Sequence, residues 1–269
     1  MVENLEKQKE HVVEIERFPV LQALFEGGKA VEKEYEVERR YVPKRPMSAD
    51  ELAKLSFLTR QIEQVYVRAV HNNGEKETVR LRRTMPEKEG VLHRIAHKRR
   101  TENPAGRKED QIYFPPEDAR NQEFEELWDK HAWHTMSKIR YYIAHTIPRT
   151  RPDGVRDDIH CTIHYDVHTD KRLRGLARIE VEFKNDDDEG YVRDLHGYQH
   201  VLPDWVGSDV TGDLAYGSKS LARYGAPLGE DIDLDTADED RERRFEEAKR
   251  SGRQRKPNTK EPGAERSHA

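Results

Sequence analysis

The chain has 269 residues, of which 38% are charged and only 34% are hydrophobic, a lean supply of apolar side chains for a conventional core. Its net charge of −5, from 48 basic and 53 acidic residues, excludes a global positive field that would attract nucleic acid. The single cysteine, Cys161, excludes an intrachain disulfide framework and favours a reducing compartment. No apolar signal core and no run of about 18 apolar residues is present. We therefore expect a cytoplasmic protein without a membrane partner, and the sequence predicts no particular oligomeric state.

Three segments of different composition follow one another along the chain. Residues 1–30 are expected to form an N-terminal helical extension, broken at Pro19 and ended by the glycine pair that starts at Gly27. Residues 31–228 carry mostly strand-like sequence and are expected to form the main domain. Residues 229–269 are rich in charged residues and poor in apolar ones, so we expect a disordered tail there.

Within the main domain, apolar and charged residues alternate with the period of two that is typical of strands. Short helices are expected at residues 48–55, with Ser48 as a candidate N-cap, and at residues 122–131. Turn-forming sequences at residues 72–74 and 186–190 indicate hairpins. Many strands joined by short turns favour an α+β fold with mainly antiparallel β structure, either a barrel or a sandwich. The expected strands cover residues 34–42, 62–70, 77–84, 92–100, 107–113, 136–144, 160–168 and 176–184.

The polar faces of these strands tend to carry charges of one sign. An ordinary half-exposed sheet with a solvated charged face is the plainest interpretation of any single strand. Across the whole set it is weaker, because a solvated sheet would more often mix signs to form cross-strand pairs. Carboxylates gathered on one strand repel each other unless metal ions or protons compensate them. The carboxylates on the polar faces are Glu36, Glu38, Glu180, Glu182 and Asp166. The cations that would face them are Arg40, Arg80, Arg82, Lys98, Lys138 and Arg140.

These charges would form a binding site if the sheet closed into a barrel with its charged faces inward and its apolar faces covered by helices. Carboxylate oxygens suit hard divalent cations such as Mg²⁺ or Mn²⁺. Arginine and lysine side chains suit phosphate oxygens. A polyanion held between a basic wall and a metal-bearing acidic wall meets the requirements of phosphoryl transfer, which depends mostly on positioning and charge neutralisation. The pattern therefore predicts a phosphate-bearing polyanion as the partner, bound with divalent metal ions.

The same residues resemble the CYTH superfamily, also called triphosphate tunnel metalloenzymes. The opening strand of that family carries Glu-x-Glu-x-Lys, and the segment from Glu36 to Arg40 (Glu-Val-Glu-Arg-Arg) is similar to it. Further similar segments follow in order along the chain, and the resemblance covers about residues 34–227. They begin at Val79, His97, Arg107, Lys138, Ile163, Ile179 and Leu202.

The resemblance implies an eight-stranded closed tunnel barrel with a charged interior and helices packed outside, which hydrolyses a triphosphate with the help of Mg²⁺ or Mn²⁺. Glu38 and Glu182 would hold the attacking water and are the predicted catalytic residues. The predicted metal ligands are Glu36, Glu38, Glu109, Asp166, Glu180 and Glu182. The predicted substrate-binding residues are Arg40, Arg80, Arg82, Lys98, Lys138 and Arg140.

Two residues depart from the family pattern. Arg40 stands where a lysine is usual, which keeps the charge but changes its reach. His164 stands where a carboxylate is common, which could alter the metal number or preference. Glu14 and Glu16 also have the spacing of the Glu-x-Glu-x-Lys signature. We do not assign them to the site, because a helix-like pattern follows them, and we expect both to be solvated. A zinc site at Cys161 and the neighbouring histidines is not expected, since Cys161 and His164 would face opposite ways on a strand.

The sequence leaves several functions open. Inorganic tripolyphosphate is the expected substrate, because no element for recognising a base is evident. The alternatives are thiamine triphosphate, a nucleoside triphosphate or an RNA 5′ end as substrate, the last being the one role for nucleic acid that we retain. An adenylyl cyclase, and a non-catalytic sensor of polyphosphate or nucleotide, also fit the pattern.

Overall fold

The computed structural model describes residues 12–28, 30–85, 90–103, 105–151, 153–173, 175–194 and 201–227. The tail predicted at residues 229–269 lies outside these ranges. Within them, no helix has both the length and the apolar character that crossing a membrane requires.

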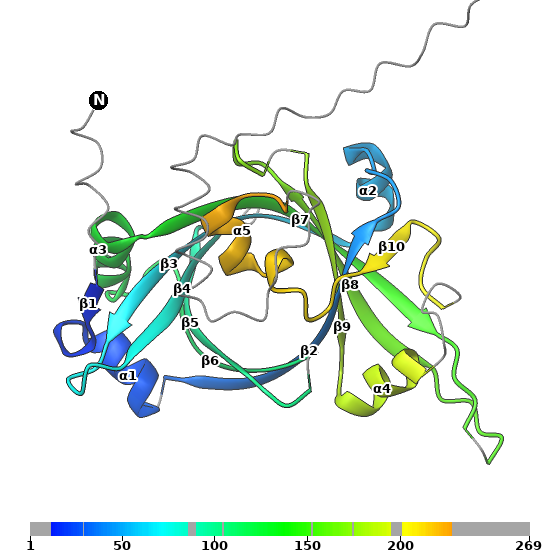
Figure 1. Ribbon diagram of the computed structural model, residues 1–269, viewed down its shortest axis with the longest axis horizontal. Helices are drawn as coiled ribbons and strands as arrows, with labels where there is room; N and C mark the ends of the chain where they lie inside the picture. The colour runs from blue at the N-terminus through cyan, green and yellow to red at the C-terminus, as the bar shows by residue number, and fades with distance from the viewer. Residues whose placement is uncertain are drawn as a thin grey trace, which may run out of the picture. The chain divides into compact units, whose positions relative to one another are not determined.

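Eight antiparallel strands form a closed barrel (Figure 1). The strands follow one another around the ring in the order β3-β4-β5-β6-β2-β9-β8-β7, and β7 pairs again with β3. Closure of this kind satisfies the hydrogen-bonding groups of every strand in the ring, so the ring has no free edge. The predicted eight-stranded closed barrel with helices outside is confirmed. The strands are β2 (Glu32–Pro43), β3 (Leu58–Val70), β4 (Lys76–Met85), β5 (Leu92–Arg100), β6 (Gly106–Phe114), β7 (His134–Ile147), β8 (Ile159–His168) and β9 (Ala177–Phe183).

Two short strands extend the sheet beyond the ring. Strand β1 (Val12–Glu14) pairs in parallel with β3, and β10 (Val206–Asp209) pairs in antiparallel fashion with β2. The first pairing corrects the expectation of a helix over this part of residues 1–30. Val12 and Val13 are β-branched and favour extended backbone, and the chain turns helical only after them. Helix α1 (Pro19–Glu26) then ends at Gly27, whose φ of 75° only glycine adopts easily.

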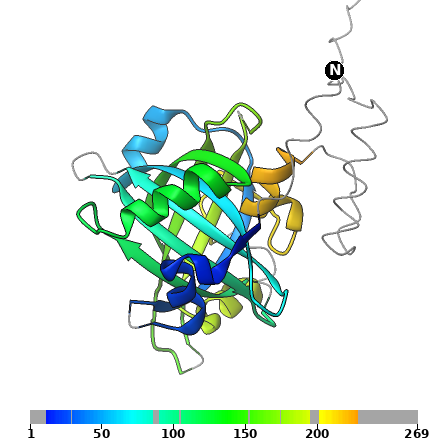
Figure 2. The same cartoon turned by 90° about the vertical axis from the view of Figure 1, so that its left-hand side faces the viewer.

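The apolar faces of the strands point outward and are covered by helices. Helices α1 and α3 (Asn121–His131) lie with β1 on one side of the barrel (Figure 2). They pack over one apolar cluster, in which Leu24 and Phe124 are buried. Helix α2 (Ala49–Leu55) packs with α4 (Asp186–Asp194) and β10 over a second cluster, in which Leu52 and Val192 are buried. The hydrophobic effect therefore stabilises the outside of the barrel wall, which leaves the inner face to polar and charged side chains.

One helix covers an end of the barrel. The short turn η4 (Leu214–Tyr216) leads into α5 (Ser218–Tyr224), which lies across the opening of the ring in Figure 1 and beside the barrel end in Figure 2. Leu221 of α5 is fully buried in an apolar cluster with Tyr66 of β3 and Met136 of β7. A small set of apolar contacts therefore holds this segment over the end of the barrel.

The two predicted helices form with the expected boundaries, but one predicted turn is wrong. Ser48 caps α2 in a capping box with Glu51. The acidic run at residues 186–190, which the sequence analysis interprets as a hairpin turn, is instead the first turn of α4. The Asn185 side chain accepts a hydrogen bond from the Asp188 N–H at 2.9 Å, and acidic side chains in a first turn interact favourably with the helix dipole. The turn predicted at residues 72–74 is present between β3 and β4.

Candidate functional site

The interior face of the barrel brings together every residue that the sequence analysis assigns to a site. Strand β2 supplies Glu36, Glu38 and Arg40, and its neighbours supply the rest by the same alternation. In register, Glu38 lies opposite Glu182 and Arg40 lies opposite Glu180 on β9. The other members are Arg80 and Arg82 on β4, Lys98 on β5, Glu109 on β6, Lys138 and Arg140 on β7, and Asp166 on β8.

The acidic strand β2 is neutralised by nearby cations. Arg40 donates to Glu38, and Lys98 donates to Glu36. Burial opposes the ionisation of Glu38, but Arg40, Lys98 and Arg178 together outweigh burial and lower the pKa of Glu38 to about 2. The pKa of Glu36 is instead raised, because burial and the nearby carboxylates of Glu109 and Glu38 together outweigh the attraction of Lys98.

Glu109 forms a second neutralised group on the neighbouring strands. It is 1% exposed and lies 2.7 Å from Arg80 Nη2 and 2.9 Å from Lys98 Nζ. Burial alone would raise the pKa of Glu109, yet these cations hold it well below its usual range. Glu109 is therefore a buried carboxylate with its charge already balanced.

The deepest charges in the barrel form a network around Asp166 and Glu180. Asp166 is fully buried and lies 2.5 Å from Lys138 Nζ, 2.7 Å from Arg140 Nε and 3.3 Å from Arg178 Nη2. Glu180 is bound by Arg140 and lies 2.6 Å from Arg178 Nη2. Burial is outweighed by Arg140 and Lys138, which hold the pKa of Asp166 far below its usual range. Burial and the neighbouring Arg140 also lower the pKa of Lys138 well below that of a free lysine.

The sequence analysis missed Arg178. The signal was present, since Arg178 shares the parity of Glu180 and Glu182 on β9 and must face the same side. Arg94 on β5 was not assigned to the site either, although it shares the parity of Lys98. It approaches Glu109 at 3.9 Å and donates to Gln111 Oε1 at 2.9 Å.

Arg82 differs from every other predicted cation of the site. Within the described ranges, no hydrogen bond or ion pair joins its guanidinium to a carboxylate, and its Nε is buried without a partner. Burial, together with the like charges of Arg80, Arg94 and Arg140, lowers the pKa of Arg82 well below its ordinary value. A half-buried cation repelled by its neighbours is costly to the fold, and an anion bound beside it would relieve that cost.

The carboxylates differ in how well they fit a metal ion. In the described part of the chain, no three His, Cys, Asp or Glu side chains converge on one point as a metal site requires. Glu109, Asp166 and Glu180 are each held by two or more cations, so their role as ligands stays a prediction. Glu36, Glu38 and Glu182 fit a metal ion better, since each has at most one close cationic or histidine partner among the described residues. The raised pKa of Glu36 also reflects repulsion from nearby carboxylates, and a bound divalent cation would reduce that repulsion.

His164 faces the interior beside this acidic wall. It is 4% exposed, and its Nδ1 lies 3.1 Å from Glu182 Oε1 and 3.0 Å from Arg140 Nη1. The ring packs edge-on against Tyr142, with centroids 4.6 Å apart. Cys161 is buried in the outer apolar cluster instead, so the two residues face opposite ways as expected. Glu14 and Glu16 are exposed on β1 and the turn after it, away from the site.

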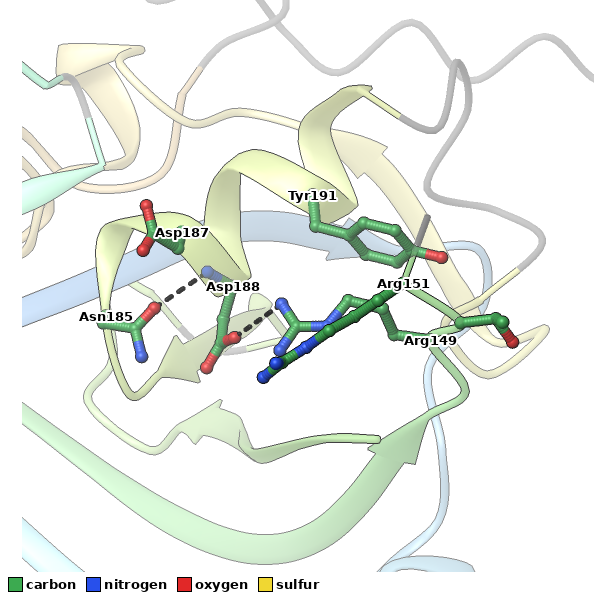
Figure 3. Close-up of a pocket in the computed structure, with 7 residues that line it drawn as sticks. Arg149, Arg151, Asn185, Asp187, Asp188 and Tyr191 are labelled. Carbon is green, nitrogen blue, oxygen red and sulfur yellow. Dashed lines mark hydrogen bonds and ion pairs between the residues drawn. The ribbon is translucent and has the colours of Figure 1, made fainter. Parts of the chain in front are cut away.

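A separate cavity lies outside the barrel, between α4 and the β7–β8 connection (Figure 3). Its volume is 410 Å³, and Arg149, Arg151, Asn185 and Tyr191 are among the residues that line it. Arg149 is bound to Asp157 and Asp188, and Arg151 is bound to Asp157. The two arginines of this cavity thus already have carboxylate partners, unlike Arg82.

Comparison with known proteins gives similarity at the level of structure. No protein-family model matches the sequence, and no curated protein matches it. Among solved structures, the hypothetical protein NE1496 is 21% identical over 70% of this chain and 97% of its own, with a TM-score of 0.37. The putative adenylyl cyclase HpAC1 from Hippeastrum, described as having a dominant triphosphatase activity, is 10% identical over 72% of this chain and 97% of its own, with a TM-score of 0.38. The protein PH1819 from Pyrococcus horikoshii OT3 is 18% identical over 60% of this chain and 90% of its own, with a TM-score of 0.36.

These similar structures are of the CYTH type. All three TM-scores lie below 0.5 and all three identities below 25%, so the similarity assigns neither an activity nor a substrate to this chain. What the chain does has to be argued from its own residues.

Proposed function

We propose that the barrel interior binds a triphosphate together with divalent metal ions and hydrolyses it, with inorganic tripolyphosphate as the substrate. The observation that carries the proposal is Arg82, a half-buried cation without a carboxylate partner in the described ranges, beside Arg80, Arg94 and Arg140. Such an excess of positive charge on one wall favours an anion with several negatively charged oxygens.

Binding would proceed by exchange of ion-pair partners. In the structure, Arg40 and Lys98 neutralise Glu38 and Glu36. Phosphate oxygens compete for the same cations, and a ligand that takes them leaves the two carboxylates free. The barrel would thus keep Glu36 and Glu38 paired when empty and exchange these ion-pair partners when a polyanion enters.

The carboxylates released in this way, Glu36 and Glu38, would then hold Mg²⁺ or Mn²⁺ with Glu182, which lies opposite Glu38 in register. A bound divalent ion would supply an activated water and neutralise charge on the phosphates. Arg80, Arg82, Lys138 and Arg140 would orient the phosphate chain from the opposite wall. Glu38 and Glu182 would position the attacking water, and His164, in contact with Glu182, would hold that carboxylate in place.

Phosphate release tests this proposal. Wild-type protein and Glu36→Gln are incubated with tripolyphosphate, ATP or thiamine triphosphate, in Mg²⁺ or Mn²⁺. We expect metal-dependent release that is fastest from tripolyphosphate and is lost in the variant. Faster release from ATP or thiamine triphosphate would identify that compound as the substrate in place of tripolyphosphate. Formation of cyclic AMP would identify the reaction as cyclisation in place of hydrolysis. Tight binding without release would leave a sensor and contradict the hydrolase.

A further inference from the structure

Arg178 connects the charges inside the barrel to the segment that covers its end. The side chain is fully buried on β9. Its Nη2 lies 2.6 Å from Glu180 and 3.3 Å from Asp166. The same guanidinium donates through Nη1 to the backbone oxygen of Tyr216 at 2.7 Å and through Nη2 to Ser218 Oγ at 3.0 Å. One planar group therefore binds two interior carboxylates and the η4–α5 segment at once.

We propose that Arg178 is a positioning residue that couples anion binding in the barrel to closure of its end by residues 214–224. The inference rests on the proposed function, because it requires a polyphosphate ligand inside the barrel. It goes further in assigning a role to a residue outside the predicted site, and in giving the covering segment two states of different stability.

The coupling follows from competition for donors. In the structure, Asp166 is bound by Lys138, Arg140 and Arg178. Glu180 is bound by Arg140 and Arg178. A triphosphate draws Lys138 and Arg140 toward its own oxygens, which leaves Arg178 as the remaining strong donor to both carboxylates. Arg178 is then held more firmly, and so are its bonds to Tyr216 and Ser218. Ligand binding thus stabilises the closed position of the segment.

The covering segment is suited to such control because few contacts hold it. It consists of a single turn of 3₁₀ helix and the seven residues of α5, and its buried apolar side chains are Leu221 and Ala222. Segments with so little buried surface open at a lower free energy than the strands beneath them. A modest gain at Arg178 is therefore a large fraction of the free energy that keeps the segment closed.

A second arginine provides a matched control. Arg172 also binds α5, since its Nη2 donates to the backbone oxygen of Ala222 at 2.5 Å and to that of Thr135 at 3.1 Å. Its hydrogen-bond partners among the described residues are backbone carbonyls, and neither Asp166 nor Glu180 is one of them. Loss of Arg172 loosens the segment without touching the interior charges.

Hydrogen exchange with and without tripolyphosphate tests the coupling, in EDTA and in Mg²⁺. In the wild type we expect exchange of residues 214–224 to slow about tenfold on binding, within the usual range of coupling between sites. The ratio of the exchange rates without and with tripolyphosphate measures the coupling. In Arg172→Met, residues 214–224 should exchange faster in both states, but this ratio should be kept. Arg178→Met should lose the ratio, and Arg178→Lys should restore part of it. Ser218→Ala, which leaves the buried charge in place, should reduce the ratio even if Arg178→Met fails to fold.

The outcomes separate the two proposals. If tripolyphosphate slows exchange in the barrel strands but not in residues 214–224, the coupling is refuted and the binding site stands. Equal behaviour of the Arg172 and Arg178 variants would refute it as well. If no strand responds to tripolyphosphate, both proposals fail. As a kinetic check, Arg178→Lys should raise the KM for tripolyphosphate more than it lowers kcat, whereas Arg172→Met should change neither by more than about twofold.

Discussion

Arg140 and Asp166 lie opposite each other on β7 and β8 and are joined by a two-pronged ion pair. Arg140 Nε lies 2.7 Å from Asp166 Oδ1, and Arg140 Nη2 lies 2.9 Å from Oδ2. Paired hydrogen bonds of this kind fix the planes of both groups. Because Asp166 is fully buried, the pair stabilises the structure mainly by keeping a buried charge from being left alone.

Arg140→Met should therefore destabilise the protein strongly. Removing one partner of a buried pair typically costs about 3 kcal/mol, because the remaining charge loses its compensation. The free energy of unfolding, measured by urea titration, gives the loss. Arg156→Met is the matched control, since Arg156 pairs with Asp158 with its side chain 72% exposed. That surface pair should contribute far less to stability, because water and salt screen its charges. A loss in Arg140→Met as small as in the control would contradict this account of the interior.

Removal of Arg82 should have the opposite effect on stability. Arg82 has no carboxylate partner in the described ranges and is repelled by Arg80, Arg94 and Arg140. Replacing it with methionine removes this repulsion and keeps a long side chain, so the free energy of unfolding should rise. Arg80→Met should lower it, because Glu109 would lose a partner at 2.7 Å. The same urea titration measures both variants. A fall in stability for Arg82→Met would mean that Arg82 is compensated after all.

His134 should make the stability depend on pH. Burial, and after it the nearby Arg223 and Arg172, lower its pKa from 6.5 to about 4. Between these values the unfolded chain binds a proton that the folded protein does not. Stability from this group is therefore complete above pH 6.5 and is lost as the pH falls toward 4. Urea midpoints of the wild type and His134→Gln, compared at several pH values, should converge as the pH falls. Parallel curves would show that His134 titrates alike in both states.

Cys161 should be unreactive in the folded protein. It is 7% exposed in the outer apolar cluster, and burial, with a smaller effect of Asp188, raises the pKa of its thiol to about 12. Since the thiolate is the nucleophile, alkylation by iodoacetamide near pH 8 should be slow in the native state and fast in urea. Mass spectrometry of the intact chain follows the reaction. Rapid labelling without urea would place the thiol at the surface.

The barrel could be predicted from the sequence because strand periodicity survives in each segment. Residues such as Glu36 and Glu38 alternate with apolar neighbours, and that alternation gives both the strands and their charged faces. The start of α4 could not be recognised, because its acidic run is equally typical of a turn and only the cap from Asn185 decides between them. The short strand that begins at Val12 could not be predicted either, since three residues are too few to show the alternation that identifies a strand.

The ion-pair partners inside the barrel could not be predicted either. Which cation meets which carboxylate depends on the register and shear of the closed sheet and on the rotamers of long side chains. That Arg82 has no carboxylate partner in the described part of the chain is visible only when every neighbouring strand is in place. The role of Arg178 is likewise set by η4 and α5, which lie far from β9 in the sequence.

Calorimetric titration of tripolyphosphate into the wild type and Arg82→Met, with Mg²⁺ and again with EDTA, tests the central claim most directly. The account predicts one binding site in the wild type and affinity at least about tenfold weaker in the variant, the loss expected when a charged contact is removed. Equal affinities in the two proteins, or no binding to the wild type in either condition, would contradict the claim that the barrel interior is a triphosphate site.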